Sequence, residues 1–289
     1  MRSDKEMMDL IISTAKNDPR VLAAYLKGSR ANPAAPRDVY QDFDVMYVVR
    51  ETGSFLEDPS WLSVFGTVLL KQEQDEDFGY GDRFGIRSRY EESYSWLLIF
   101  DDGSRIDIGV ETPACLAQGR NRNKLFLLLL DKTGCLPQLP APSDRDYHVQ
   151  PPAPGQFQGC CNEFFWSLCD VCKGIQRDEL PFAMTTYHTR TRIMLEQMLV
   201  WYVGCRTGFS LSCGKLNKYL KNHLPEDWYS DYTQIYSGSD YPGFRKAVRA
   251  ACGLFRKAAL AVGAHLGYSY PQEAETGFFR YEEILRRLG

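Results

Sequence analysis

The sequence lacks a long hydrophobic run. Its longest strongly apolar stretch, residues 125–130, is far below the roughly 20 residues that a membrane-spanning helix needs. The N-terminus also lacks the apolar core of a secretory signal peptide, because charged residues precede the short run at residues 10–12. We therefore expect a cytoplasmic protein with no membrane partner.

An excess of positive charge is also missing. The chain has 34 lysines and arginines against 37 aspartates and glutamates, which gives a formal net charge of −3. Such a charge offers no general attraction to a nucleic-acid backbone. We expect no nucleic-acid partner and a small, positively charged substrate. We also expect a monomer.

No disulfide framework is evident. The nine cysteines are an odd number with irregular spacing, and a chain of 289 residues can bury a core without disulfides. Cys169 and Cys172 have C-x-x-C spacing, but no second pair repeats it and the four histidines lie far apart. We expect reduced, mostly buried cysteines and no zinc site.

The N-terminal half combines helix and strand signals. Ser3 and Glu6 form a capping-box pattern, which predicts a helix that ends near Asp18. Residues 21–27 and 43–49 are short apolar runs that predict strands. Residues 96–100 and 106–110 flank Asp102-Gly103, a strong hairpin signal. These signals predict an α+β domain with a mixed β-sheet and flanking helices over residues 1–136.

The pattern changes in the second half of the chain. Six prolines fall between Pro137 and Pro154, so residues 137–156 are predicted to be a linker. Beyond it, apolar residues recur at helical spacing, as at Phe164, Leu168 and Val171. We therefore predict a helical bundle domain over residues 157–289.

Three aspartates are the first candidates for chemistry. Asp42 and Asp44 lie two apart at the start of a predicted strand, so both side chains point to one face. Asp107 lies between Ile106 and Ile108 in the second strand of the predicted hairpin. If that strand pairs beside the first, three carboxylates converge at one rim of the sheet.

A metal ion would explain such a cluster. Like charges are costly to bury together unless a cation neutralises them, and Mg²⁺ binds a few carboxylates together with phosphate oxygens. Gly28 and Ser29 at a strand end would let backbone N–H groups approach a phosphate, and Arg30 would contact the same triphosphate. The combination indicates metal-assisted phosphoryl chemistry.

Each part taken alone also has an ordinary structural explanation. A Gly-Ser turn is usually a plain connection, Asp-x-Asp often marks a solvated strand end, and Asp107 could face outward from the sheet. The ordered combination of the three motifs is what favours a functional site.

That ordered combination resembles the nucleotidyltransferase superfamily that includes DNA polymerase beta. More closely, the chain resembles the aminoglycoside 6-adenylyltransferases, the streptomycin-modifying enzymes. The segments that carry the resemblance are residues 1–10, 28–32, 41–45, 105–108, 146–149, 160–164 and 208–215.

The resemblance implies an activity and a set of residues. ATP would bind with Mg²⁺, for which we expect two ions, and AMP would be transferred to the 6-hydroxyl of streptomycin with release of pyrophosphate. Asp42, Asp44 and Asp107 match the family's magnesium-binding carboxylates, and Gly28 and Ser29 match its phosphate-binding turn. The helical domain would bind the acceptor and close one side of the cleft.

Further candidates lie in the helical half. Glu163 stands among aromatic residues, where it suits proton transfer or the binding of a guanidinium, although an exposed helix charge is an equal alternative. The resemblance places Lys173 and Lys215 where they would neutralise triphosphate charge. Whether Asp107 or Glu163 is the general base stays open.

Two loop segments have less certain roles. The glycine-rich residues 78–85 have the wrong spacing for a dinucleotide fingerprint and are predicted to be a loop near the site. Glu73, Asp75, Glu76 and Asp77 are expected to form a solvated loop, with long-range attraction of a polycationic substrate as a second hypothesis.

Two alternatives to an aminoglycoside transferase remain. One is a nucleotidyltransferase that acts on RNA or protein, and the lack of a basic stripe disfavours the RNA acceptor. The other is an inactive nucleotide-binding module, against which the retention of all three carboxylates argues.

Overall fold

The computed structural model describes residues 1–85, 89–118, 125–136 and 141–288. The chain forms two compact units, Met1–Asp146 and Tyr147–Gly289. The division falls within the predicted linker 137–156, of which residues 137–140 lie outside the described residues. Each unit is described by itself.

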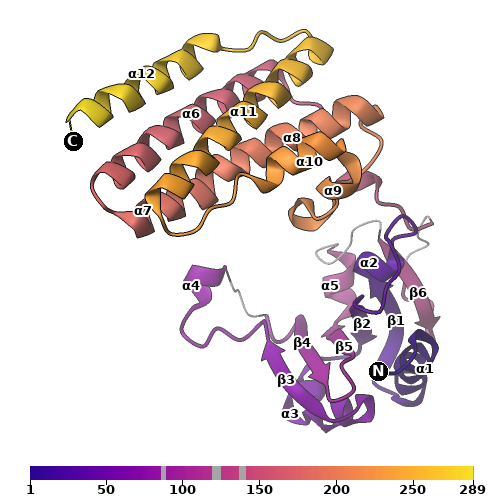
Figure 1. The fold of residues 1–289 in the computed structure, drawn as a ribbon. Coiled ribbons are helices and arrows are strands. Elements are labelled where there is room, and N and C mark those ends of the chain that lie inside the picture. Colours follow the sequence, from indigo (N-terminus) through magenta and orange to yellow (C-terminus); the bar gives the residue numbers. More distant parts are fainter. Residues whose placement is uncertain (86–88, 119–124, 137–140, 289) are drawn as a thin grey trace. The chain divides into compact units, whose positions relative to one another are not determined.

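The described part of the first unit contains a mixed six-stranded sheet with the strand order β3-β4-β5-β2-β1-β6 (Figure 1). Strands β2 and β5 are parallel, and the other neighbours are antiparallel. The strands are β1 (Val21–Lys27), β2 (Phe43–Val49), β3 (Val68–Glu73), β4 (Ser93–Phe100), β5 (Arg105–Glu111) and β6 (Phe126–Asp131). The strands predicted at residues 21–27 and 43–49 and the hairpin are confirmed.

Alternation along β2 assigns the two faces of the sheet. Val45 and Tyr47 point to a core formed with helix α1 (Asp4–Asn17), where the Tyr47 hydroxyl donates to the Ile11 carbonyl at 2.7 Å. Asp44 lies on the opposite face together with Met46, because side chains alternate along a strand. The predicted capping box of Ser3 and Glu6 is present at the start of α1.

The two faces are covered differently. Helices α1, α3 (Gly53–Glu57) and η1 (Pro59–Phe65) pack on the first face. On the second face, Leu116 of α5 (Pro113–Ala117) packs on β1, β2 and β6. Short helices α2 (Gly28–Ala31) and α4 (Gly81–Phe84) complete the unit. The carboxylates therefore lie on the less covered face.

The second unit is a helical bundle, as predicted (Figure 1). Its central helices pack through aromatic side chains, such as Phe164 and Phe255, whose rings stack at 3.9 Å. The helical elements are η2 (Arg145–Tyr147) at its start, α6 (Pro154–Gln176), α7 (Leu180–Thr186), the π-helix η3 (Tyr187–Thr191), α8 (Arg192–Thr207), η4 (Lys215–Asn217), α9 (Leu220–His223), α10 (Glu226–Thr233), α11 (Tyr241–Leu266) and α12 (Gln272–Leu288).

Helix α6 begins at Pro154 rather than after Gln156, so the last residues of the predicted linker are helical. Proline is favoured in the first turn of a helix because its missing N–H has no intrahelical partner there. Cys172 of α6 is buried and Cys169 donates to the Phe165 carbonyl, as expected for core residues. All nine cysteines are free thiols.

Within the part of the chain that the structure covers, no helix is both long enough and apolar enough to cross a membrane.

Candidate active site

Strand pairing brings the three predicted carboxylates together. Asp44 of β2 is in register with Asp107 of the parallel neighbour β5, and Asp42 precedes β2 by one residue. Parallel neighbours place in-register side chains on the same face, so Asp44 and Asp107 share the less covered face. The expected pairing of the two strands is therefore confirmed, and it sets Asp44 beside Asp107, whereas a site shared by all three aspartates stays a prediction.

The electrostatics of Asp44 reflect this arrangement. Burial, the charge of Asp107 and the charge of Asp42 raise the pKa of Asp44 to about 6, while Lys27 and Arg105 act in the opposite direction. A carboxylate surrounded by others binds a divalent cation favourably, because the cation removes the repulsion.

The backbone conformation at position 28 and the closeness of Asp44 together require glycine there. It has a φ of +69°, and a Cβ atom built at this position would lie 2.4 Å from Asp44 Oδ2. Only glycine adopts this conformation without strain and leaves room for the carboxylate. The turn of Gly28 and Ser29 is thereby held directly against the carboxylate site.

The structure gives Arg30 a role other than the predicted triphosphate contact. Its guanidinium donates to both carboxylate oxygens of Asp4, at 2.7 and 3.0 Å, and to the carbonyls of Gln41 and Asp42. It also lies 3.7 Å from the centroid of the Phe43 ring. Arg30 is buried, and its donors are directed into the protein. It therefore holds the residues just before β2 in place rather than facing a ligand.

Arg105 is a site residue that the sequence analysis missed. Its Nε and Nη2 donate to the two oxygens of Asp107, both at 2.9 Å, and its Nη1 lies 3.5 Å from Asp42 Oδ2. The sequence spacing could have revealed Arg105, since a residue two positions before Asp107 in a strand must share its face.

Lys27 was also missed. It lies opposite Asp44 in the β1–β2 pairing and immediately precedes Gly28. Its positive charge lowers the pKa of Asp44 and also opposes the raised pKa of Asp75. A lysine between the carboxylates and the glycine turn is well placed to contact an anionic group.

The acidic stretch that follows from the end of β3 is only in part the solvated loop that we expected, since Asp77 is exposed but Asp75 and Glu76 are half-buried. Asp75 is half-buried and accepts hydrogen bonds from the backbone and hydroxyl of Ser95; burial raises its pKa. Glu76 accepts hydrogen bonds from the hydroxyls of Tyr94 and Tyr90, at 3.1 and 3.2 Å. Asp75 and Glu76 are thereby tied to β4, whereas Asp77 accepts a hydrogen bond from the backbone N–H of Gly81 at 2.8 Å, outside the sheet.

The residues present fit Mg²⁺ by chemistry, since carboxylate oxygens are its preferred ligands. As the side chains stand, however, no group of three or more potential ligands converges on one point within the described ranges. Arg105 bonds both oxygens of Asp107 and lies beside Asp42. Binding of a cation by all three aspartates therefore requires Arg105 to release Asp107.

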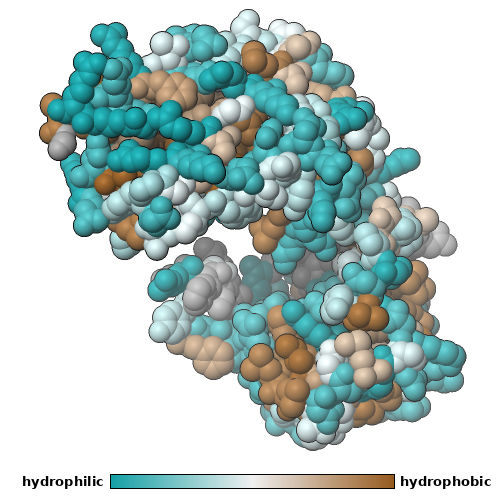
Figure 2. Space-filling model, viewed as in Figure 1, coloured by the Kyte–Doolittle hydropathy of each residue, from teal (hydrophilic) through white to brown (hydrophobic). Residues whose placement is uncertain are grey.

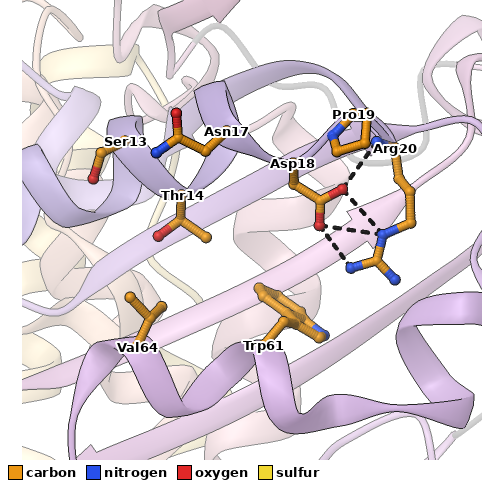
Figure 3. A pocket seen from close by; sticks show the side chains of 8 residues that line it. All are labelled: Ser13, Thr14, Asn17, Asp18, Pro19, Arg20, Trp61 and Val64. Atoms are coloured by element: carbon orange, nitrogen blue, oxygen red, sulfur yellow. Dashed lines mark hydrogen bonds and ion pairs between the residues drawn. The ribbon is translucent and has the colours of Figure 1, made fainter.

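A hollow of about 550 Å³ in the same unit is separate from this site (Figure 3). It lies between the end of α1 and η1, where Asp18 and Arg20 are paired at 2.6 Å. Trp61 lines it and packs edge-on against Trp96, which belongs to the core on the other face of the sheet from Asp44.

The predicted candidates of the helical unit are spread over two elements. Glu163 is half-buried on α6, and no hydrogen bond or ion pair engages its carboxylate within the described residues. Lys173, also on α6, pairs with Asp170 at 2.6 Å. Lys215 is exposed in η4. These three residues and the aspartates belong to different units.

The helical unit also contains a polar network that sequence reasoning missed. Arg192 donates to Glu196 at 3.0 Å and to the Tyr236 hydroxyl at 2.8 Å, and Tyr232 donates to Glu196 at 2.8 Å. Arg192 follows the π-helix η3 directly, and such irregular turns are frequent at functional sites. The π-helix would have pointed to this network, but the sequence pattern does not reveal a π-helix.

A mixed sheet that presents paired carboxylates and a third from a parallel neighbour, beside a glycine turn, defines a nucleotidyltransferase. The chain belongs to the streptomycin adenylyltransferase family, whose sequence model matches residues 1–284.

Two relatives of known name agree with this assignment. The chain is 34% identical over 271 residues to an aminoglycoside 6-adenylyltransferase of Campylobacter jejuni, covering 94% of this chain and 92% of the relative. It is 33% identical over 285 residues to the enzyme of the same name from Bacillus subtilis, with 98% of both chains covered. A crystal structure of an aminoglycoside 6-adenyltransferase from Bacillus subtilis aligns over 99% of both chains, at 28% identity and a TM-score of 0.48.

Proposed function

We propose that this protein transfers AMP from ATP to the 6-hydroxyl of streptomycin and releases pyrophosphate. The observation that carries the proposal is the parallel register of β2 and β5, which sets Asp44 opposite Asp107 beside the turn at Gly28. The names of the relatives support an aminoglycoside as the acceptor.

The reaction assigns a task to each part of the site. The acceptor hydroxyl oxygen attacks the α-phosphorus of ATP, the bond from that phosphorus to the pyrophosphate oxygen breaks, and the hydroxyl proton passes to a carboxylate. Asp42, Asp44 and Asp107 would hold Mg²⁺, which when bound neutralises the phosphate oxygens and the leaving pyrophosphate.

The remaining residues of the first unit bind and orient the nucleotide. In this proposal the backbone at Gly28 and the hydroxyl of Ser29 contact phosphate oxygens, and Lys27 supplies a positive charge beside them. Arg105, which bonds Asp107 and lies beside Asp42, would exchange its contact with Asp107 for one with a phosphate oxygen if Asp107 held the cation.

The helical unit, residues 157–289, is assigned to the acceptor in this proposal. Glu163 is the candidate for contact with a guanidinium group, because its half-buried carboxylate has no partner among the described residues. Lys173 and Lys215 remain proposed triphosphate contacts. Asp107 and Glu163 are both retained as candidates for the general base.

The direct test incubates the protein with ATP, Mg²⁺ and streptomycin and measures pyrophosphate release and the mass of the antibiotic product. AMP attached to the 6-hydroxyl, located by NMR of the product, is the expected result. Folded Asp42→Asn and Asp44→Asn variants should show no transfer.

Parallel reactions with RNA, with protein and with other aminoglycosides test the alternative acceptors. AMP transfer to RNA or protein but not to an aminoglycoside would reject the proposed acceptor and leave the nucleotidyltransferase chemistry in place. Absence of transfer to every acceptor would favour a nucleotide-binding module.

A further inference from the structure

A cluster of basic residues lies at one end of the helical bundle. The end of α6, the start of α11 and the end of α12 lie at the same end of the bundle as α7 (Figure 1). Residues of these three helices line a hollow of about 590 Å³. Its lining residues are Gln176, Pro242, Arg245, Lys246, Arg249 and Arg286. Four of these six side chains are cations, and none is a carboxylate.

A carboxylate beside the hollow, that of Glu282, already has two arginine partners. Glu282 of α12 is buried, and its carboxylate accepts a hydrogen bond from Arg286 at 2.6 Å and lies 3.6 Å from Arg249. Arg245 donates to the neutral side chain of Gln176 at 3.0 Å. Two of the four cations, Arg249 and Arg286, thus share Glu282, and no ion pair of the described residues engages Arg245 or Lys246.

Pairing with the buried Glu282 accounts for Arg249 and Arg286, but folding gives no reason for the charges of Arg245 and Lys246 beside them. Arg245 and Arg249 lie four residues apart on α11, a spacing at which like charges destabilise a helix. Arg245 and Lys246 lie in the second turn of α11, far from its C-terminal end, so the helix dipole does not favour their positive charge. Only Arg286, at the end of α12, is favoured by the dipole.

We infer that this hollow binds a small polyphosphate, such as pyrophosphate or the triphosphate group of a nucleotide. Guanidinium groups match phosphate oxygens in planar, two-point hydrogen bonds, and three arginines converge here from two helices. Several cations against one occupied carboxylate favour a ligand with more than one phosphate charge. The inference does not depend on the proposed function, because the residues lie outside the site described above.

The test is calorimetric titration of the full chain with sodium pyrophosphate at low salt in EDTA, which suppresses metal-dependent binding at the aspartates. Under these conditions the unaltered protein should bind one pyrophosphate per chain. The Arg245→Gln, Arg249→Gln double variant should bind at least about tenfold more weakly, because two charge-assisted contacts are lost. Arg286 still pairs with Glu282 in this variant, so the fold should persist, and circular dichroism checks this.

A matched control removes the same charge elsewhere. Lys16 and Arg280 are exposed and do not line the hollow, so Lys16→Gln with Arg280→Gln should leave pyrophosphate affinity within about twofold of the starting value. Equal loss in both double variants would reduce the effect to general charge attraction and overturn the inference. Absence of binding by the unaltered protein at millimolar pyrophosphate would also overturn it.

Competition by ATP and by adenosine tests whether the hollow recognises phosphate groups. ATP should compete with pyrophosphate in EDTA, and adenosine should not compete, because the arginines contact phosphates only. Competition by adenosine as strong as that by ATP would contradict recognition through phosphate groups.

Discussion

Replacing Gly28 by alanine tests the packing of the turn against the carboxylate site. The added Cβ would lie 2.4 Å from Asp44 Oδ2, whereas ordinary contacts begin near 3.4 Å, so the carboxylate or the turn must move by about 1 Å. Alanine at a φ of +69° also costs about 1–2 kcal/mol in backbone strain. A displacement of about 1 Å in a reacting geometry lowers a rate by roughly 100-fold.

The chain offers a matched control for this substitution. Gly134 has the same φ of +69°, but nothing lies within 4 Å of a Cβ atom built there. Gly134→Ala should therefore carry the same strain without touching the site. Both variants should lose about 1–2 kcal/mol of unfolding free energy, which is a few degrees in Tm.

The assay combines denaturant unfolding with kcat/KM for AMP transfer to the aminoglycoside. Gly28→Ala should lose about 100-fold in kcat/KM, equivalent to about 2.7 kcal/mol of transition-state stabilisation, while Gly134→Ala stays within about twofold. Near-normal kcat/KM in Gly28→Ala would refute the claim that this glycine sets the position of Asp44. A comparable loss in Gly134→Ala would attribute the effect to stability alone.

Three further predictions concern the charged groups around this turn. Asp44→Asn should raise Tm at pH 7.5 in EDTA, because the folded state raises the pKa of Asp44 from 3.8 to about 6 and its ionised form is therefore disfavoured. The gain, at most about 3 kcal/mol, should fade as pH falls from 6 to below 3.8, and an equal gain at pH 3.5 would contradict it. Arg105→Gln should lower stability in EDTA by about 1 kcal/mol, and Mg²⁺ should raise its Tm more than that of the unaltered protein, because a cation replaces the lost guanidinium charge. A smaller Mg²⁺ response than in the unaltered protein would count against the metal assignment. Arg30→Ala should cost about 2–3 kcal/mol, because the carbonyls of Gln41 and Asp42 lose their donor, while the KM for ATP stays nearly constant. A large rise in that KM with unchanged stability would restore the predicted triphosphate contact.

Local sequence patterns were sufficient for α1, β1, β2 and the hairpin of β4 and β5, but they did not reveal β3, β6 or the short helices of the first unit. The short apolar runs at residues 21–27 and 43–49 predict β1 and β2, and the capping box of Ser3 and Glu6 marks the start of α1. These features depend on neighbours within a few residues, so one chain segment determines them.

The roles of individual charged residues depended on distant partners. Arg30 follows the glycine turn in sequence, but Asp4 and the carbonyls of Gln41 and Asp42 take up its donors. Asp75 belongs to an acidic stretch that is solvated by composition, yet Ser95 of a neighbouring strand binds it. Such partners are separated by 11 to 26 residues in these hydrogen bonds of Arg30, and no local pattern identifies them.

The sequence by itself determined the strand, the turn and the presence of Asp42, Asp44 and Asp107 in one ordered set, because period-two geometry and glycine conformation are local properties. Only the tertiary structure decided that β2 and β5 are parallel neighbours and that Asp44 and Asp107 therefore share one face. It also decided that Gly28 must lack a side chain because Asp44 occupies the space. Pairing between strands that are far apart in sequence is fixed by the packing of the whole sheet, so it becomes visible only when the sheet has formed.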